Sequence, residues 1–280
     1  MNKLLRADFS RLFKSKEFWI CAALMFAVSV GNALRAINSA KNFSSDTKFY
    51  IDEYVFGLAP YTAIIPAVLI SLFLGTEYSD KTIRNKLIIG HTRTNIYLAD
   101  FMTCFAGSVI MLAVWFVGMF PGALFTDGFM IGALGVLKYF AIAVGFTAVF
   151  CSVFVLIGAL SPNRTLVVVL VMAAWGALMF AGGIVVDKIA NVDLAGISEV
   201  VNGKEMITQA GRNRLMTYRT FSRILPTGQA MIMAMVGYGH FSHNLGKMFE
   251  SFLIDIAFSL ILTVIFIAVG IFFFRKKELK

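Results

Sequence analysis

Long apolar segments alternate with short polar ones along the chain, and this alternation predicts its main elements. Six segments contain uncharged runs of 17 to 26 residues. At the rise of an α-helix, runs of about this length cross the apolar core of a lipid bilayer. The chain is therefore predicted to span a membrane six times. The predicted spans are residues 18–37, 55–76, 101–126, 139–161, 165–186 and 254–274.

The composition agrees with this pattern. Of the 280 residues, 59% are hydrophobic and 15% are charged, and the mean hydropathy is +0.79. Soluble domains are usually about 45–50% apolar and about 25% charged, so a water-soluble fold cannot bury this much apolar surface. These values exclude soluble, disordered and disulfide-scaffold proteins. We expect an all-α membrane protein in which residues 1–280 form one transmembrane domain.

A seventh apolar stretch, near residues 225–240, is too short and too polar to cross. It lies in the predicted outer loop, residues 187–250, and only residues 230–238 are apolar enough to enter lipid. Such a segment is stable at membrane depth only where protein covers its backbone polar groups. We therefore predict a re-entrant segment before the last span.

Lysine and arginine set the predicted orientation. With both termini in the cytoplasm, the cytoplasmic segments carry 14 of these residues and the two short outer loops carry four. This asymmetry follows the positive-inside rule. The formal net charge of +9 then reflects membrane topology, and we expect no nucleic-acid partner. The predicted location is the plasma membrane, with several spans and both termini cytoplasmic.

The first 17 residues have the pattern of a surface helix. Leu5, Phe9, Leu12 and Phe13 recur at helical spacing among several basic residues. A helix of this kind lies in the membrane interface with its apolar side toward the lipid. We predict an N-terminal amphipathic interfacial helix over residues 1–17. The alternative is an ordinary basic flank without helical order.

The predicted cytoplasmic loop at residues 77–100 is too long for a simple connection between two spans. Ile83 and Leu87 lie four residues apart, as on one face of a helix. Gly90 is placed to end that helix in a left-handed turn, and Thr92 or Thr94 is placed to cap the next span. The loop is predicted to hold a short helix that contacts a cytosolic partner. The alternative is a solvated basic loop that only sets topology.

The same loop carries an extended run of residue types. The run reads Glu77-Tyr78-x-x-Lys81-Thr82-Ile83-Arg84-Asn85-Lys86-Leu87-x-x-Gly90-x-x-Arg93-x-x-Ile96-Tyr97. It closely resembles the first cytoplasmic loop of ABC-2-type permeases, the membrane subunits of certain ATP-binding cassette exporters. Lys81 and Asp100 depart from that pattern, and we expect both departures to matter little. Within the family, the chain is most similar to permeases for antimicrobial peptides such as bacitracin and lantibiotics.

The resemblance implies a role for each part of the loop. Ile83 and Leu87 would form an apolar knob inserted into an ATPase subunit, and Arg84 and Lys86 would face acidic groups around it. Glu77 would hold the coupling helix against the second span. The residues implied in coupling to the ATPase are Thr82, Ile83, Arg84, Asn85, Lys86, Leu87, Gly90 and Arg93.

The stretch before the last span also resembles this family, whose members fold short re-entrant helices on the outer side. The implied re-entrant residues are Leu225, Pro226, Gly228 and Gln229. The resemblance thus covers essentially the whole chain. It further implies partners of three kinds: a dimer of cytosolic ATPase subunits, a second copy of the permease or a paralogous one, and the lipid bilayer of a bacterial plasma membrane.

Several chemistries lack their motifs in this chain. It contains no G-x-x-x-x-G-K-[ST] phosphate loop, so ATP and magnesium are expected on the partner subunit, and no cofactor or catalytic residue on this chain. His240 and His243 have metal-like spacing without a third ligand, so no metal site is expected. The predicted function is ATP-driven export of an amphipathic substrate. The alternatives are an ion-coupled secondary transporter and a non-transporting scaffold or sensor.

Overall fold

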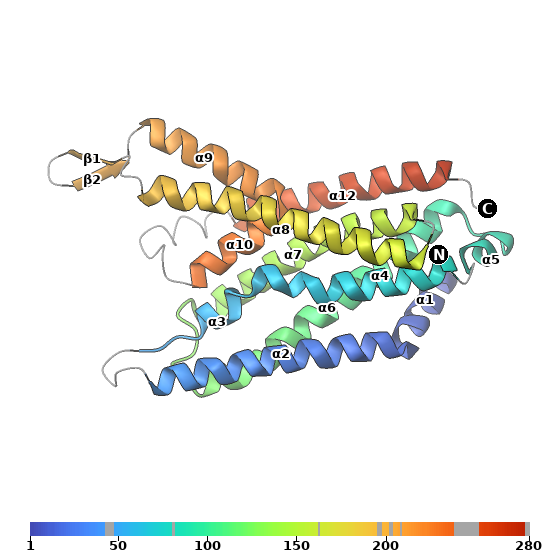
Figure 1. The fold of residues 1–280 in the computed structure, drawn as a ribbon, viewed down its shortest axis with the longest axis horizontal. Helices are drawn as coiled ribbons and strands as arrows, with labels where there is room; N and C mark the ends of the chain where they lie inside the picture. The colour runs from blue at the N-terminus through green and yellow to red at the C-terminus, as the bar shows by residue number, and fades with distance from the viewer. Residues whose placement is uncertain are drawn as a thin grey trace.

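The computed structural model describes residues 1–42, 48–79, 82–161, 163–194, 198–201, 204–207, 209–237 and 252–277. Within these ranges, six helical segments are long and apolar enough to cross a membrane, which confirms the predicted all-α membrane fold. They lie side by side in one elongated bundle (Figure 1). The six segments are α2 (Lys16–Lys41), α3 to α4 (Asp52–Glu77), α6 (Arg93–Leu124), α7 (Gly132–Leu160), α8 (Arg164–Leu194, apolar to Ile189) and α12 (Phe252–Lys276).

The second spanning segment is not one continuous helix. It consists of α3 (Asp52–Phe56), a 3₁₀ helix, η1 (Ala59–Ala63), and α4 (Ile64–Ser79). Pro60 occupies the first turn of η1, where its missing N–H costs no intrahelical hydrogen bond. The chain therefore changes helix type within this span, which the uninterrupted apolar run did not indicate.

The third span begins earlier than the sequence predicted. Residues 77–100 were predicted to be loop, but α6 already starts at Arg93. The prediction rested on uncharged runs, and it therefore left out the two charged residues in the first turns of α6, Arg93 and Asp100. Thr92 caps this helix, because its hydroxyl accepts a hydrogen bond from the backbone N–H of Asn95 at 3.3 Å. The predicted loop thus shrinks to α5 (Thr82–Ile88) and short connections.

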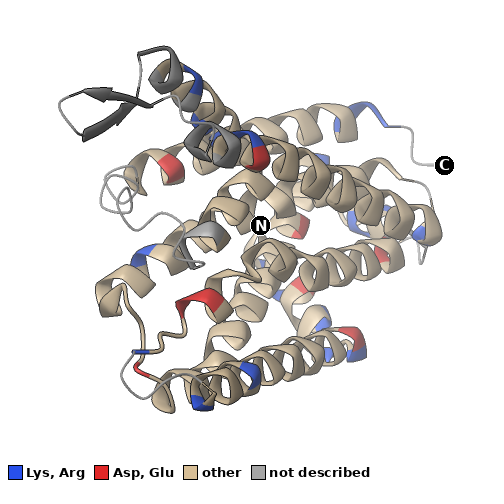
Figure 2. Ribbon diagram, turned by 60° about the vertical axis from the view of Figure 1, so that its left-hand side comes forward, with Lys and Arg blue, Asp and Glu red and all other residues tan. Residues whose placement is uncertain are grey.

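Both termini lie at the same end of the bundle, together with α1 (Asn2–Lys14) and α5 (Figure 1). We call this the terminal end. Lysine, arginine, aspartate and glutamate lie mostly toward the ends of the long helices (Figure 2). Large apolar side chains are exposed along the outside of the bundle, including Trp19, Val117, Phe180 and Val264. A surface of this kind is expected for helices that face lipid.

The opposite end of the bundle holds connections that pair with one another. The backbone N–H of Asp127 donates to the Phe49 carbonyl at 3.0 Å, and the N–H of Ile51 donates to the Gly128 carbonyl at 3.0 Å. The Asp52 carboxylate accepts from the backbone N–H of Met130 at 2.7 Å. The segments before α3 and after α6 are thereby fixed to each other.

Within the described residues of the predicted outer loop, residues 187–250, the chain forms further secondary structure. The strands β1 (Ser198–Val201) and β2 (Lys204–Ile207) form a two-stranded antiparallel hairpin. Two helices follow, α9 (Gln209–Ile224) and α10 (Pro226–Gly237). They form a hairpin that enters the bundle from the end opposite the termini and turns back (Figure 1). Helix α10 packs against α8, α3 and α7.

Candidate functional site

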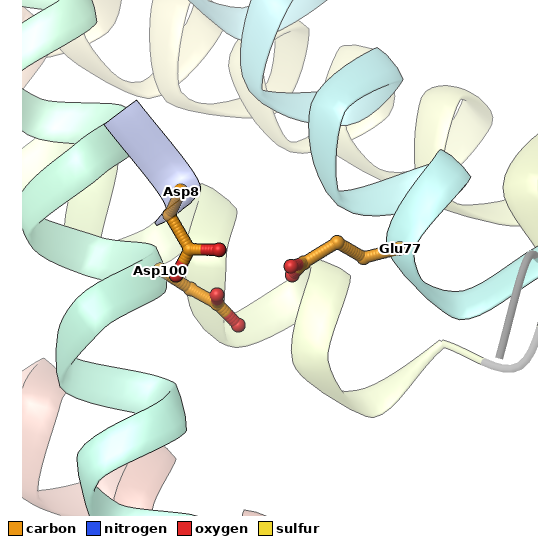
Figure 3. A group of neighbouring side chains, drawn as sticks. All are labelled: Asp8, Glu77 and Asp100. Carbon is orange, nitrogen blue, oxygen red and sulfur yellow. The ribbon is translucent and has the colours of Figure 1, made fainter. Parts of the chain in front are cut away.

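Five charged side chains from four elements meet near the terminal end. We call Asp8, Arg11, Glu77, Lys86 and Asp100 the ion cluster. The Lys86 ammonium lies at its centre, 2.5 Å from Glu77 Oε1, 2.9 Å from Asp8 Oδ1 and 3.3 Å from Asp100 Oδ1. The three carboxylates converge from α1, α4 and α6 (Figure 3). The cluster therefore joins the short helix α5 to three other helices at once.

Arg11 on α1 is the second cation of the ion cluster. Its Nη1 donates to Glu77 Oε1 at 2.8 Å, and its guanidinium lies 4.0 Å from the centre of the Phe73 ring. Phe73 and Glu77 are one turn apart on α4, so one arginine contacts the helix through both an ion pair and a cation–π interaction. Helix α1 is thus fixed directly to the end of α4.

Local backbone structure places Lys86 in the cluster. Thr82 begins α5, and its hydroxyl donates to the Glu77 carbonyl at 2.9 Å. The helix ends at Ile88, and Gly90 two residues later has a φ of 96°, as predicted for a left-handed turn. The N–H of Gly90 donates to the Leu87 carbonyl at 3.0 Å, and that of His91 to the Lys86 carbonyl at 3.1 Å. These turns orient α5 so that Lys86 faces inward.

Burial and charge act in opposite directions on Lys86. Burial alone lowers the pKa of its ammonium, but the neighbouring carboxylates of Asp100, Glu77 and Asp8 outweigh it, so the pKa is raised. The pKa of Asp8 is also raised, chiefly by burial and then by the Glu77 charge, while Lys86 and Arg11 act to lower it. Lys86 is therefore a permanent cation that neutralises part of the negative charge of the three buried carboxylates.

We tested whether the carboxylates fit a metal ion. One oxygen each from Asp8, Glu77 and Asp100 lies within 4.8 Å of the others. The Lys86 ammonium already contacts all three side chains, and Arg11 contacts Glu77. A divalent cation would have to displace Lys86, so the donor set does not fit a metal. His240 and His243 lie outside the described residues.

The predicted apolar knob does not have the predicted residues. Ile83 is only 3% exposed and belongs to the core of the chain, and Leu87 packs against that core. Because Ile83 already has its partners within the chain, the prediction that it inserts into another subunit is wrong. The exposed apolar side chains are instead those of Ile88 and Ile89, at 75% and 76%. Arg84, Asn85 and Gly90 are exposed beside them.

Two charged residues also differ from their predicted roles. Lys86 was expected to face acidic groups of a partner, but it is engaged within the ion cluster. Arg93 was expected in the same contact, but its Nη1 donates to the backbone carbonyls of Phe274, Arg275 and Lys277 at the end of α12. Both cations thus hold the chain's own helices together.

The roles of Asp8 and Asp100 were not predicted from the sequence. Asp100 was expected to matter little, yet it is buried and contacts Lys86. Asp8 lies midway between Leu4 and Leu12, four residues from each, and all three are buried on one face of α1. This spacing was available in the sequence and indicated a buried carboxylate. The predicted apolar face instead included Phe13, which is exposed.

The residues predicted for a re-entrant segment lie in the α9–α10 hairpin. Leu225 lies at the turn and Pro226 begins α10. Gly228 allows α10 to lie against the backbone of Ser222, and Gln229 donates from Nε2 to the Arg223 carbonyl at 2.8 Å. Residues 238–240 of the predicted segment lie outside the described residues.

The hairpin also has a polar contact with the last span. Arg223 Nε lies 2.8 Å from Asp255 Oδ1, and the Ser259 hydroxyl donates to Gln229 Oε1 at 2.9 Å. These bonds pair polar groups of α9 and α10 with groups of α12, which lowers the cost of placing them among apolar helices.

Comparison with known proteins agrees with this architecture. Residues 4–186 match the family described as ABC-2 family transporter protein. None of the curated proteins compared with the chain matches it. The match covers α1 to α7 and most of α8, and therefore includes the whole ion cluster and α5. The chain belongs to the ABC-2 family of transporter permeases, the membrane subunits that generally work with a cytosolic ATPase.

Proposed function

We propose that this chain is the permease subunit of an ATP-driven exporter. In this proposal the terminal end faces the cytoplasm, where a dimer of ATPase subunits that carries ATP and magnesium contacts α5. Two permeases, either two copies of this chain or this chain and a paralogue, pair in the membrane. ATP-driven closure of the ATPases displaces α5 and opens a path for substrate. The permease itself performs no covalent chemistry.

The observation that carries the proposal is the two-sided character of α5. One side is fixed within the chain by Lys86 and Ile83, whereas Ile88 at its end and the following Ile89 are 75% and 76% exposed. Neighbouring apolar side chains exposed at the end of a protein, with a cation beside them, are typical of a contact with another protein. A helix that is fixed on one side and has an exposed apolar edge on the other is suited to transmit a displacement from a partner to the helices it contacts.

The proposed substrate is amphipathic, in the class of antimicrobial peptides, drugs and lipid-like molecules. The resemblance of the chain to permeases for bacitracin and lantibiotics supports this class. The absence of an Asp, Glu, Lys or Arg from the middle of the predicted spans supports ATP as the energy source, because ion-coupled carriers usually need an ionisable group there.

The test replaces Ile88 and Ile89 together with Asp in the full chain. Charges placed in an apolar contact are desolvated on binding, so we expect loss of ATPase association and of transport, with normal abundance in the membrane. The measurement is co-purification of a subunit that carries a phosphate-loop motif, followed by ATP-dependent flux of a fluorescent cationic peptide from reconstituted vesicles. The matched control is Met130→Asp, an exposed apolar residue at the opposite end.

Three outcomes contradict the proposal in different ways. Normal assembly and flux in the double variant would place the ATPase contact elsewhere. Transport that persists without ATP while an ion gradient is maintained would identify a secondary transporter. Absence of any ATP-dependent flux in the wild-type complex with its ATPase would favour a scaffold or sensor.

A further inference from the structure

At the terminal end of the bundle, two cations join the ends of three spans by binding helix C-termini. The last carbonyls of an α-helix have no intrahelical donor, and a cation at this position stabilises them and the negative end of the helix dipole. Arg93, at the start of α6, donates to the carbonyls of Arg275 at 2.9 Å and of Lys277 at 2.5 Å. It also reaches the Phe274 carbonyl at 3.3 Å. Arg93 therefore caps α12 from another helix.

Lys277 caps the end of α7 in the same way. Its Nζ donates to the carbonyls of Ala159 at 2.9 Å and of Ser161 at 3.1 Å, at the end of α7. Burial lowers the pKa of this ammonium, as expected for a cation enclosed between helix ends. Because Arg93 binds the backbone of Lys277, and the side chain of Lys277 binds α7, the two caps are consecutive links.

Side-chain packing strengthens the first link. Tyr97 is one turn after Arg93 on α6, and its ring lies 6.1 Å from that of Phe274. The Tyr97 ring also fits against Gly270, where a Cβ would collide with the phenol. The first two turns of α6 are therefore in close contact with the end of α12.

The same two turns of α6 also touch α5. Asp100 lies one turn beyond Tyr97 and contacts Lys86 of α5 at 3.3 Å. A continuous set of contacts thus leads from α5 through the start of α6 to α12, and from α12 to α7. We propose that Arg93 and Lys277 are positioning residues that make these helix ends one unit, so that a displacement of α5 moves α12, the last span. This inference rests on the proposed function for the source of the displacement.

The unit itself is tested without a partner, by hydrogen exchange of the full chain in lipid nanodiscs. Arg93→Gln removes the cap of α12 and should release Lys277 from α7. We expect roughly fivefold faster exchange both at the end of α12 and at the end of α7, corresponding to the loss of about one hydrogen bond's net stabilisation. The control, Arg275→Gln, removes an exposed charge at the same place and should change neither. Faster exchange at the end of α12 alone would show that these helix ends do not form one unit.

The transmission step is tested in the complex with the ATPase. Phe272→Cys on α12 and Val169→Cys on α8 introduce two exposed sites for spin labels, and the native cysteines are buried. We expect ATP to change the distance between the labels in the wild-type background and in Arg275→Gln. In Arg93→Gln the ATPase should still co-purify, because Ile88 and Ile89 are intact, but the ATP-dependent change should be lost.

The failures of the two proposals are distinguishable. If no ATPase binds the wild-type chain, the proposed function fails, and the exchange measurement still decides whether the helix ends form one unit. If the ATPase binds but ATP leaves the label distance unchanged in the wild type, or changes it equally in Arg93→Gln, the transmission through Arg93 is wrong.

Discussion

Gly228 at the start of α10 lies against the backbone of Ser222 near the end of α9, so closely that a Cβ at residue 228 would stand 2.5 Å from the Ser222 carbonyl oxygen. The neighbouring atoms are backbone and cannot move aside as a flexible side chain can. The turn between α9 and α10 therefore depends on glycine at this position.

We expect Gly228→Ala to destabilise the α9–α10 hairpin by about 1–3 kcal/mol, the usual cost of forcing extra volume into a packed contact. The measurement is thermal unfolding in detergent together with protease resistance of the hairpin. The control is Gly183→Ala, where the added Cβ would have ordinary contact with Met231 Cε at 3.9 Å. Equal stability of both variants would show that the hairpin does not need this close approach.

Lys86 should be one of the most sensitive positions in the chain. Lys86→Met removes the cation that contacts three buried carboxylates, and we expect a loss of about 3–5 kcal/mol in unfolding free energy. Arg84→Met, on the exposed side of the same helix, should cost little. Adding Asp100→Asn to Lys86→Met removes one unpaired charge and should restore part of the stability. A double variant less stable than Lys86→Met would argue against charge as the cause.

The raised pKa of Asp8 gives a pH dependence with a definite sign. Because the folded chain binds the Asp8 proton more tightly than the unfolded chain does, the stability that this group contributes is present below its ordinary pKa of 3.8. That contribution is lost as the pH rises through the folded value. In Asp8→Asn this loss is absent, so the stability of the variant relative to wild type should improve from about pH 4 to about pH 7.

The measurement for Asp8 is the difference in melting temperature between the two proteins at each pH. The opposite trend would mean that Lys86 and Arg11 hold the pKa of Asp8 below its ordinary value in the folded chain.

The sequence predicted the spans better than it predicted the cluster. Uncharged runs identify the helices that meet lipid because lipid excludes charge over the full width of its apolar core. The same criterion assigns every charged residue to solvent, and this is why Asp100 and Arg93 were placed in a loop. Their burial depends on cations and carbonyls from elements far away in the chain, such as Lys86 for Asp100 and the end of α12 for Arg93.

Local backbone signals were read correctly where they depend on one residue. Gly90 adopts the left-handed conformation and Thr92 caps α6, because both properties follow from the residue's own geometry. The direction in which α5 faces does not follow from its own sequence. Ile83 and Ile89 are equally apolar, and only the packing of α4 and α6 decides that Ile83 is buried while Ile89 is exposed.

The orientation of the chain in the membrane is open to a direct test. We expect Met130→Cys to react with a membrane-impermeant maleimide in intact cells, and Ile89→Cys to react only after the membrane is opened, because the two lie at opposite ends of the bundle. A tag at residue 1 should report cytoplasm and a tag near residue 204 should report the outside. The reverse pattern would invert the proposed orientation, and with it the side on which an ATPase can act.

The interruption of the second span by η1 divides this span into two helical parts that meet at residues 57–63. The part formed by α3 and η1 packs against α10, whereas α4 packs against α8 and α5. The two parts thus differ in these neighbours, while α2 contacts both α3 and α4, and α7 contacts both η1 and α4. A displacement of α4 at the terminal end can bend the span at residues 57–63 without moving α3 as a rigid extension of α4. The segment that contacts α10 can therefore stay in place while α4 moves.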